Sequence, residues 1–207
     1  MSAVATRSDD RVLVQALRLG DERAAEQLLE SYGGAMKRFA AGLVGSAAVA
    51  DEVVQETWIA VLRGIDRFEG RSSLKTWIFG ILANIAKTQA QRERRTVPLS
   101  TFELEGSDEA AVDAACFRSD GHWVSAPSRW SELPEERLAA GETLACIARA
   151  LGALPPAQRA VMTLRDVEGW SGEEVCATLG LTDANQRVLL HRARSKVRAA
   201  IDAELQV

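Results

Sequence analysis

The chain has 207 residues, of which 47% are hydrophobic and 5% aromatic, and its formal net charge is −4. Ala, Leu, Arg and Glu dominate and runs of β-branched residues are scarce, which favours an all-α fold of one large or two small domains. No stretch approaches the ~20 apolar residues of a membrane-spanning helix, the N-terminus lacks the apolar core of a signal peptide, and three widely spaced cysteines do not suggest a disulfide framework. We therefore expect a reduced, cytoplasmic protein without membrane insertion.

The charge is distributed unevenly along the chain. Residues 102–142 contain ten acidic and three basic residues, a local net charge of −7, which leaves +3 for the remainder. Two near-neutral to basic blocks therefore flank an acidic middle. This pattern permits binding of nucleic acid by the blocks without requiring it.

The first block is predicted to consist of several amphipathic helices. Gly20 and Gly33–Gly34 are predicted to mark turns, and Ser46 is a candidate N-cap. A loop over 66–73 leads into a helix over 73–95 whose tail is basic. The residues predicted to face inward are Val12, Leu13, Ala16, Leu17, Ala25, Leu28, Leu29, Val49, Val53, Trp58 (or Val54), Val61, Leu62, Trp77, Ile78, Ile81, Leu82 and Ile85.

No helical periodicity survives between residues 97 and about 134, where Pro, Gly and Ser accompany two Trp. We interpret this segment as an acidic linker, either disordered or with a function of its own. It contains Cys116 and His122, but two ligands do not make a zinc site, which normally needs four. We therefore expect no metal and no cofactor. Cys146 and Cys176 lie on apolar stripes and are predicted to be core residues.

The C-terminal block carries the signals of a helix-turn-helix. A helix is predicted to begin at Pro155–Pro156, where proline suits the first turn. Ser171 and Glu174 form a Ser-x-x-Glu capping box at the start of a short helix. Gly180 permits a sharp turn, and Thr182 is predicted to cap a longer final helix. Two helices joined by a short, Gly-containing turn are typical of the helix-turn-helix motif.

Positive charge is concentrated on the final predicted helix. Residues 181–198 contain five Lys or Arg and a single acid. Four basic residues at spacings of three and four are predicted to share one face: Arg187, His191, Arg194 and Arg198. Such like charges repel by a few tenths of a kcal/mol per pair, and an anionic partner would offset that cost. We interpret this as a recognition helix facing phosphates; an ordinary solvated face is the alternative.

Together these segments resemble an extracytoplasmic-function (ECF) sigma factor, a two-domain initiation factor of bacterial RNA polymerase. Residues 50–95 are similar to the centre of sigma domain two, and residues 151–198 to sigma domain four. The resemblance implies an all-α protein with domain two at 8–96, a long acidic linker at 97–136 and a helix-turn-helix domain four at 137–207. It also implies a protein that is not an enzyme and that directs promoter-specific transcription initiation.

The resemblance assigns partners and roles to particular residues. The partners it implies are core RNA polymerase through the β′ clamp and β subunits, promoter DNA, and an anti-sigma factor. The motif implied to dock on the β′ clamp coiled coil is Asp51, Glu52, Val54, Gln55 and Glu56. The residues implied to trap melted minus-10 bases and their phosphates are Arg67, Phe68, Glu69, Gly70, Arg71, Ser72, Ser73, Asn84, Lys87, Arg92, Arg94 and Arg95. The residues implied to read minus-35 duplex are Asp183, Ala184, Asn185, Arg187, Val188, His191, Arg192, Arg194 and Lys196.

The chemistry of these positions suits the implied roles. An acidic helix face steers and orients docking on a basic coiled coil. A base removed from the stack costs a few kcal/mol, so its pocket must return stacking and hydrogen bonds; Phe68 offers a surface, Ser72 a hydroxyl, and Gly70 permits the turn. Asn84 carries both donors and acceptors. The alternatives are a core position for Phe68 and for Trp77, and a buried, satisfied amide for Asn84.

Three residues of the final helix depart from the family pattern: Gln186, Val188 and Leu189. Val188 and Leu189 are expected to point outward and are candidates for a protein-docking patch. Two rival functions stay open at this point. One is a conventional helix-turn-helix regulator whose first block senses or dimerises. The other is an enzyme that uses Cys116 and His122, against which stands the lack of a third orienting group nearby.

Overall fold

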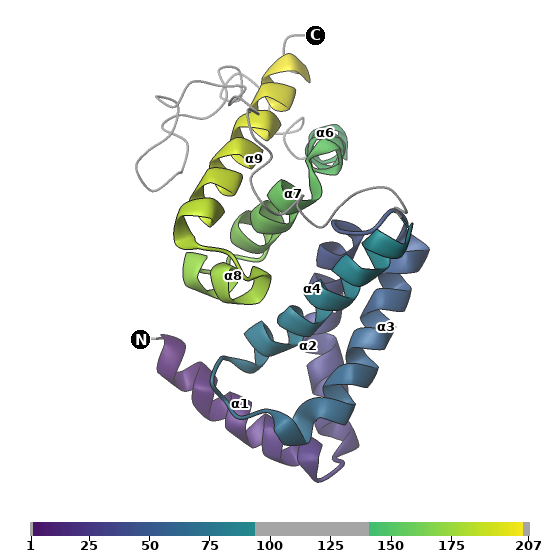
Figure 1. The fold of residues 1–207 in the computed structure, drawn as a ribbon, viewed down its shortest axis with the longest axis vertical. Helices are drawn as coiled ribbons and strands as arrows, with labels where there is room; N and C mark the ends of the chain where they lie inside the picture. The colour runs from purple at the N-terminus through teal and green to yellow at the C-terminus, as the bar shows by residue number, and fades with distance from the viewer. Residues whose placement is uncertain (1, 94–140, 205–207) are drawn as a thin grey trace.

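The computed structural model describes residues 2–93 and 141–204 as two helical bodies (Figure 1). The first contains α1 (Ser2–Arg18), α2 (Glu22–Ala41), α3 (Ala47–Gly64), the short 3₁₀ turn η1 (Ile65–Arg67) and α4 (Leu74–Glu93). The second contains α6 (Gly141–Ala153), α7 (Pro156–Met162), the π-helical turn η5 (Thr163–Val167), α8 (Gly172–Leu179) and α9 (Asp183–Glu204). The all-α prediction is confirmed, since none of the described residues forms a strand. The predicted linker, 97–136, lies outside the described residues.

Local signals set several helix starts in the first body. The carboxylate of Asp21 accepts hydrogen bonds from the backbone N–H groups of Arg23 and Ala24, at 2.9 and 3.3 Å, and so caps α2. The predicted cap Ser46 is confirmed: its hydroxyl accepts a hydrogen bond from Val49 N at 3.3 Å. Gly20, with φ of +77°, makes the predicted turn before α2.

The predicted turn at Gly33–Gly34 is wrong, because both glycines lie inside α2. The helix continues through them because Leu28, Met36 and Phe39, on either side, are buried on one face. Packing of an amphipathic face therefore outweighs the low helix propensity of glycine.

The core of the first body lies between α2, α3 and α4. The rings of Phe39 and Phe79 meet there with their centroids 5.8 Å apart. Three residues predicted to face inward are exposed instead: Val12 at 71%, Leu29 at 45% and Leu62 at 50%. Other predicted core residues are buried as expected, namely Leu17, Leu28, Val53, Val61, Ile78 and Leu82.

The helix-turn-helix prediction is confirmed in the second body. Pro156 occupies the first turn of α7. Ser171 N donates to Glu174 Oε2 at 2.9 Å and Glu174 N donates to Ser171 Oγ at 3.2 Å, which completes the capping box. Gly180 ends α8 with φ of +69°, and the Thr182 hydroxyl accepts a hydrogen bond from Asn185 N at 3.2 Å at the start of α9. Cys146 is buried and Cys176 is partly buried, in keeping with core positions.

The two bodies contact each other through α4 and α8. Trp170, only 3% exposed, packs its ring edge-on against Phe79 with centroids 4.8 Å apart. Lys75 Nζ lies 4.2 Å from the centre of the Trp170 ring and 2.9 Å from Glu174 Oε1. Arg38 of α2 donates to Glu168 Oε1 at 2.7 Å. An aromatic and ionic contact therefore joins the bodies in this arrangement.

Within the described ranges, no helix has both the length and the apolar character needed to cross a membrane. Among the same residues, no group of three or more His, Cys, Asp or Glu is placed to hold a metal ion. Cys116 and His122 lie outside the described residues.

Candidate polymerase and nucleic-acid interfaces

The outer face of α3 is acidic and open to solvent. Asp51, Glu52, Gln55 and Glu56 are all exposed. Asp51 Oδ1 lies 2.9 Å from Lys37 Nζ, but both side chains are more than half exposed, so this ion pair contributes little to stability. Most of the predicted docking motif is therefore available to a partner.

Val54 differs from the rest of that motif, because it is 4% exposed and belongs to the core. Further along α3, Ile59 and Leu62 are 49% and 50% exposed. Ile59 lies four residues after Gln55 and Leu62 three residues after Ile59, so all three share one side of the helix. The acidic face thus continues into a short apolar one, which the inward prediction for Leu62 had missed.

The loop between η1 and α4 holds half of the predicted minus-10 residues, Phe68 to Ser73, and Arg67 ends η1 just before it. Arg67, Glu69 and Arg71 are exposed, and Arg71 Nε donates to Glu69 Oε2 at 2.7 Å. Gly70 turns the loop with φ of +71°, and an added Cβ there would meet no atom within 4 Å. The turn therefore depends on glycine for its backbone conformation and not for space.

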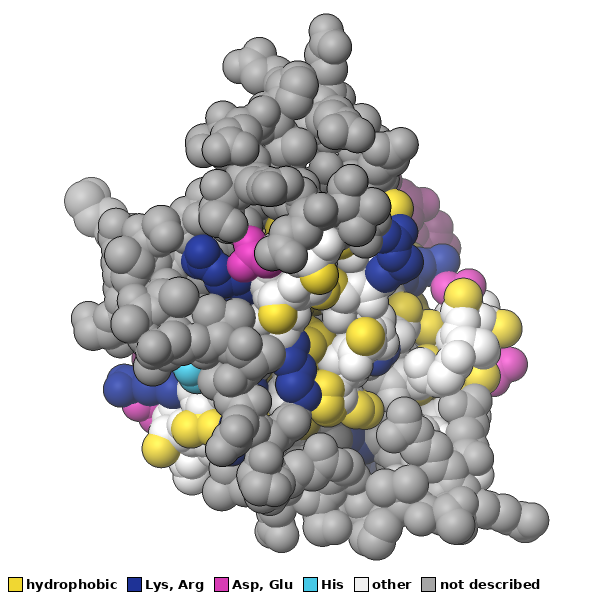
Figure 2. All heavy atoms as spheres, turned by 90° about the horizontal axis from the view of Figure 1, so that it is seen from above, with side chains coloured by type: hydrophobic (Ala, Val, Ile, Leu, Met, Phe, Trp, Pro, Cys, Tyr) yellow, Lys and Arg dark blue, Asp and Glu magenta, His cyan; other side chains and the backbone are white. Residues whose placement is uncertain are grey.

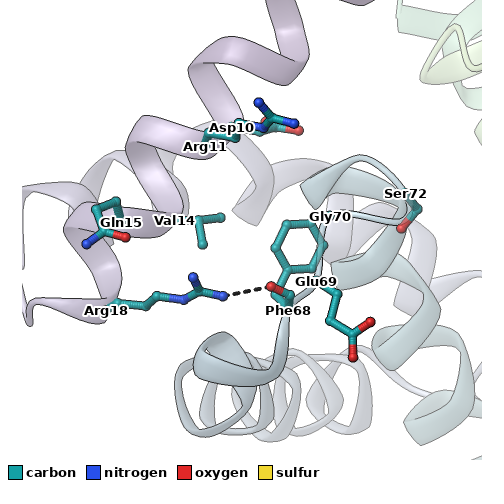
Figure 3. Close-up of a pocket in the computed structure, with 9 residues that line it drawn as sticks. All are labelled: Asp10, Arg11, Val14, Gln15, Arg18, Phe68, Glu69, Gly70 and Ser72. Carbon is teal, nitrogen blue, oxygen red and sulfur yellow. Dashed lines mark hydrogen bonds between the residues drawn. The ribbon is translucent and has the colours of Figure 1, made fainter.

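Phe68 combines features of the two roles considered for it, a core position and a surface that stacks on a base. Its ring packs against Trp77 with centroids 5.1 Å apart at an angle of 49°, and both residues are partly buried. Phe68 also lines a cavity of about 260 Å³ (Figure 3). Ser72 lines the same cavity, while the hydroxyl of Ser73 accepts from Thr76 N at 3.1 Å and so helps to start α4.

Helix α1 supplies the opposite wall of this cavity, although no residue of α1 was among the predicted site residues. The lining residues from α1 are Asp10, Arg11, Val14, Gln15 and Arg18. Val14 points from α1 towards the ring of Phe68 (Figure 3). Nothing in the spacing along the chain reveals this pairing, because α1 and the loop are about 50 residues apart and meet only through tertiary packing.

Asn84 is exposed on α4, so the alternative of a buried amide is wrong. Lys87, one turn further on, is half-buried and its Nζ donates to the carbonyl oxygen of Leu179 at 3.3 Å. Burial lowers the pKa of Lys87. Arg92 is exposed, while Arg94 and Arg95 lie outside the described residues.

The first turns of α9 present an exposed surface after the helix-turn-helix turn. Asp183, Ala184, Arg187 and Val188 are exposed, and Asn185 is partly buried. Arg187 Nη2 lies 2.8 Å from Asp183 Oδ2, in a pair one helical turn apart with both side chains largely exposed. A pair of this kind is weak, so the Arg187 guanidinium is able to exchange it for another acceptor.

The prediction of a single basic face on α9 is wrong. Arg194 and Arg198 are 4% and 7% exposed because that side of α9 packs against α6 and α7. Arg194 donates through Nε and Nη2 to the two carboxylate oxygens of Asp166, at 2.8 and 2.6 Å. Where described side chains are visible in Figure 2, Lys and Arg form separate groups with hydrophobic side chains between them. His191, Arg192 and Lys196 are partly buried.

The predicted docking patch of Val188 and Leu189 is also wrong. Leu189 is 7% exposed and lies in the core, whereas Val188 is 37% exposed. Gln186 is 3% exposed and lies near Gly172 at the start of α8. Two of the three unusual residues of α9 therefore affect packing within the helix-turn-helix, and only Val188 faces outward.

The electrostatics of the contact between the bodies favour its ionised form. Burial alone would raise the pKa of Glu174, but hydrogen bonds from Lys75 and from Ser171 outweigh it, so the pKa is lowered. The hydrogen bond to Glu168 raises the pKa of Arg38. In each case the contact between the bodies stabilises the charged form of the group whose pKa it shifts.

Comparisons with known proteins agree with the two-part organisation. Residues 28–96 match the family model of sigma-70 region 2, and residues 144–197 match sigma-70 region 4. The chain is 31% identical over 197 residues to the ECF RNA polymerase sigma-E factor of Escherichia coli K12, covering 95% of this chain and 94% of that protein. It is 30% identical over 201 residues to the RNA polymerase sigma-H factor of Pseudomonas aeruginosa PAO1, covering 97% and 96%. The chain belongs to the ECF sigma factors.

Two solved structures share the fold of this chain. CnrH in complex with the cytosolic domain of CnrY superimposes with a TM-score of 0.60 at 26% identity, covering 94% of this chain and 98% of CnrH. RpoE from Bartonella quintana, in complex with the anti-sigma factor NepR, gives a TM-score of 0.57 at 24% identity, covering 88% and 96%, a likeness of fold.

This sigma factor directs promoter-specific transcription initiation and is not an enzyme. The region 2 match includes α3, the loop and α4, and the region 4 match includes α7, α8 and most of α9. Helix α1 precedes residue 28, where the region 2 match begins. The cavity wall formed by α1 therefore lies outside the matched segment.

Proposed function

We propose that this sigma factor acts in the cytoplasm and docks on the β′ clamp of core RNA polymerase through the outer face of α3. The observation that carries this proposal is the exposure of four polar and acidic side chains on one helix, beside a buried core face: Asp51, Glu52, Gln55 and Glu56. An acidic face meeting a basic coiled coil speeds encounter and fixes orientation. The exposed apolar residues Ile59 and Leu62 extend the same contact. Burying their side chains against a partner is favourable through the hydrophobic effect.

The promoter is read by two separate surfaces, one in each body. Residues 8–96 act as domain two, whose loop 67–73 traps a melted minus-10 base while Asn84 reads another with its exposed amide. Residues 137–207 act as domain four, whose α9 enters the major groove at the minus-35 element. There Arg187 suits a guanine edge, Asn185 an adenine edge, and Val188 a thymine methyl. Residues 97–136 act as the connecting linker.

Opening of the DNA strands is driven by binding. Bases that have left the stack are captured on the protein surface, and this capture offsets the cost of unpairing. The phosphates of the DNA backbone contact basic residues in both bodies. On and after α4 these are Lys87, Arg92, Arg94 and Arg95, and on α9 they are Arg192 and Lys196. Each phosphate neutralised in this way adds to an affinity that falls with salt.

An anti-sigma factor is the expected inhibitory partner. CnrH and RpoE of Bartonella quintana, which share this fold, are bound in their solved structures to CnrY and to the anti-sigma factor NepR. In the arrangement described, Lys87 already donates to Leu179 of the second body. A partner that holds the two bodies together would thereby keep part of the minus-10 surface from DNA.

The docking face is tested by a charge reversal, Glu52→Arg with Glu56→Arg, in a pull-down with core polymerase. A matched control on α2 is Glu26→Arg with Glu30→Arg, since these two are also exposed and four residues apart. The α3 variant is expected to lose co-purification with β′ and run-off transcription together, while the α2 variant keeps both. Equal retention of core by the two variants contradicts the proposed docking site.

A further inference from the structure

We infer that α1 forms the second half of the base-capture pocket and that Arg18 is its positioning residue, holding the loop in the conformation that accepts a single unstacked nucleobase. The inference deepens the proposed minus-10 role of the loop and rests on it. It concerns residues that lie before the start of the region 2 match at residue 28.

Arg18 reaches across to the loop and binds it through its backbone. Its Nε donates to the carbonyl oxygen of Ile65 at 3.3 Å, and its Nη2 donates to those of Asp66 and Phe68 at 3.3 and 2.7 Å. The bond to Phe68 is drawn in Figure 3. These carbonyls lie along and just after the 3₁₀ turn η1, and that of Ile65 also accepts a hydrogen bond from Phe68 N at 3.2 Å. A planar guanidinium offers several donors in a fixed fork and satisfies all three; a lysine ammonium has no such geometry.

Asp10 holds the other end of the loop. Its Oδ2 accepts a hydrogen bond from Leu74 N at 3.0 Å, at the first residue of α4. Asp10 and Arg18 are eight residues apart in α1, which corresponds to about 12 Å along the helix axis and a little over two turns. The two side chains therefore lie on the same side of α1. Helix α1 therefore fixes the loop where it begins and where it ends, and leaves the residues between them to form the pocket mouth.

The pocket between these two anchors suits one base. Its volume is about 260 Å³, just below the ~300 Å³ at which pockets for larger ligands begin. Val14 and the ring of Phe68 face each other as apolar walls (Figure 3), and Ser72 adds a polar group to the lining. Flat apolar faces with a polar edge are the features of a nucleobase, and stacking on an aromatic ring offsets part of the cost of removing the base from the stack.

The charge of the pocket argues against a free phosphate as its ligand. Arg11 and Arg18 line it together with Asp10 and Glu69, so the formal charges balance. The donors of Arg18 are already directed at loop carbonyls. A neutral ring is therefore favoured over an isolated anion, since nothing in the lining gives net attraction to negative charge.

The test uses holoenzyme assembled from core polymerase and the full chain, and a single-stranded oligonucleotide library randomised through the minus-10 element of the non-template strand. Bound and unbound sequences are compared for the wild type, Arg18→Lys and Arg18→Gln. Arg23→Gln, at an exposed arginine near the start of α2, is the matched control. Asp10→Asn acts at the other end of the loop as a second, independent variant. Core affinity and melting temperature are measured for every protein.

Enrichment at one base position is expected to fall roughly tenfold in both Arg18 variants, the scale of one lost base-specific contact. The position read by Asn84, the core affinity and the Arg23 control are expected to stay as in the wild type, and Asp10→Asn is expected to weaken the same position. Unchanged enrichment in the Arg18 and Asp10 variants overturns the inference, as does a uniform loss at all positions together with core binding. A wild type that enriches no base overturns the proposed function itself.

Discussion

Substitution of Arg194 tests whether this residue of α9 stabilises the fold or contacts DNA. Its side chain is 5% exposed and makes two hydrogen bonds to Asp166, whose side chain is 25% exposed. Arg194→Met keeps most of the length and apolar stem of the side chain but removes the charge. The carboxylate of Asp166 then loses this partner while staying largely shielded from water.

The magnitude follows from that burial. Breaking a buried ion pair costs about 3–5 kcal/mol, and the partial exposure of Asp166 reduces this to roughly 2–3 kcal/mol, because water solvates the remaining carboxylate. At about 2–4 °C per kcal/mol for a chain of this size, the melting temperature is expected to fall by roughly 5–10 °C. The double variant Arg194→Met with Asp166→Leu should recover most of the loss, because no buried charge is left uncompensated.

Thermal unfolding followed by circular dichroism measures the stability, and the salt dependence of promoter binding by the holoenzyme measures the phosphate contacts. We expect Arg194→Met to leave the slope of log K against log salt unchanged, whereas loss of one phosphate contact lowers the slope by about 0.9. Arg192→Ala serves as the comparison for a proposed phosphate contact. An unchanged melting temperature together with a reduced slope would refute the structural assignment of Arg194.

Four further results are expected. Asn84→Ala changes minus-10 base preference and leaves minus-35 preference as it is; a promoter library with an unaltered minus-10 motif contradicts this. Arg187→Ala weakens minus-35 binding by ~1–3 kcal/mol if the guanidinium binds a guanine edge, and an unaltered motif in a selected library removes it from the reading set. Trp170→Ala lowers the free energy of unfolding by about 3–5 kcal/mol, measured by urea denaturation, and a loss under 1 kcal/mol contradicts its packing against Phe79. The pKa of Glu174 is lowered in the folded state, so its contribution to stability is present above its unfolded pKa of about 4.3 and is lost as pH falls through the folded pKa. The Glu174→Gln variant is therefore expected to lose less stability than the wild type when the pH is lowered into the acid range. Equal losses of stability in the two proteins contradict the contact.

Features set by neighbouring residues were predictable from the sequence. The capping box of Ser171 and Glu174, the αL turn at Gly180 and the cap at Thr182 all depend on hydrogen bonds within a few residues, so their spacing alone predicts them. The same holds for Ser46. The helix-turn-helix followed from these signals before any tertiary contact was known.

Features that depend on which side of a helix is covered were not predictable. Arg194 and Leu189 were expected outside, but α9 packs on α6, α7 and α8, and both residues are buried. Helical spacing defines which residues share a face, and only the position of the neighbouring helices decides whether that face is buried. Gly33–Gly34 shows the same effect, since the burial of Met36 and Phe39 carries α2 through two residues with low helix propensity.

The cavity at the specificity loop is the clearest case of tertiary assembly. Arg18 meets Phe68 across 50 residues of sequence, and no local pattern marks an arginine on α1 as a partner of a distant backbone carbonyl. The loop residues themselves were identifiable by resemblance, while the helix that holds them was visible only once the chain was folded.

The most direct test of promoter-specific initiation is to sequence the 5′ ends of transcripts made in vitro from fragmented genomic DNA by core polymerase, with and without this protein. We expect a set of start sites that appears only with the protein and shares two upstream motifs at a fixed spacing. Identical start sites in the two reactions, from a protein shown to be folded, would contradict the account.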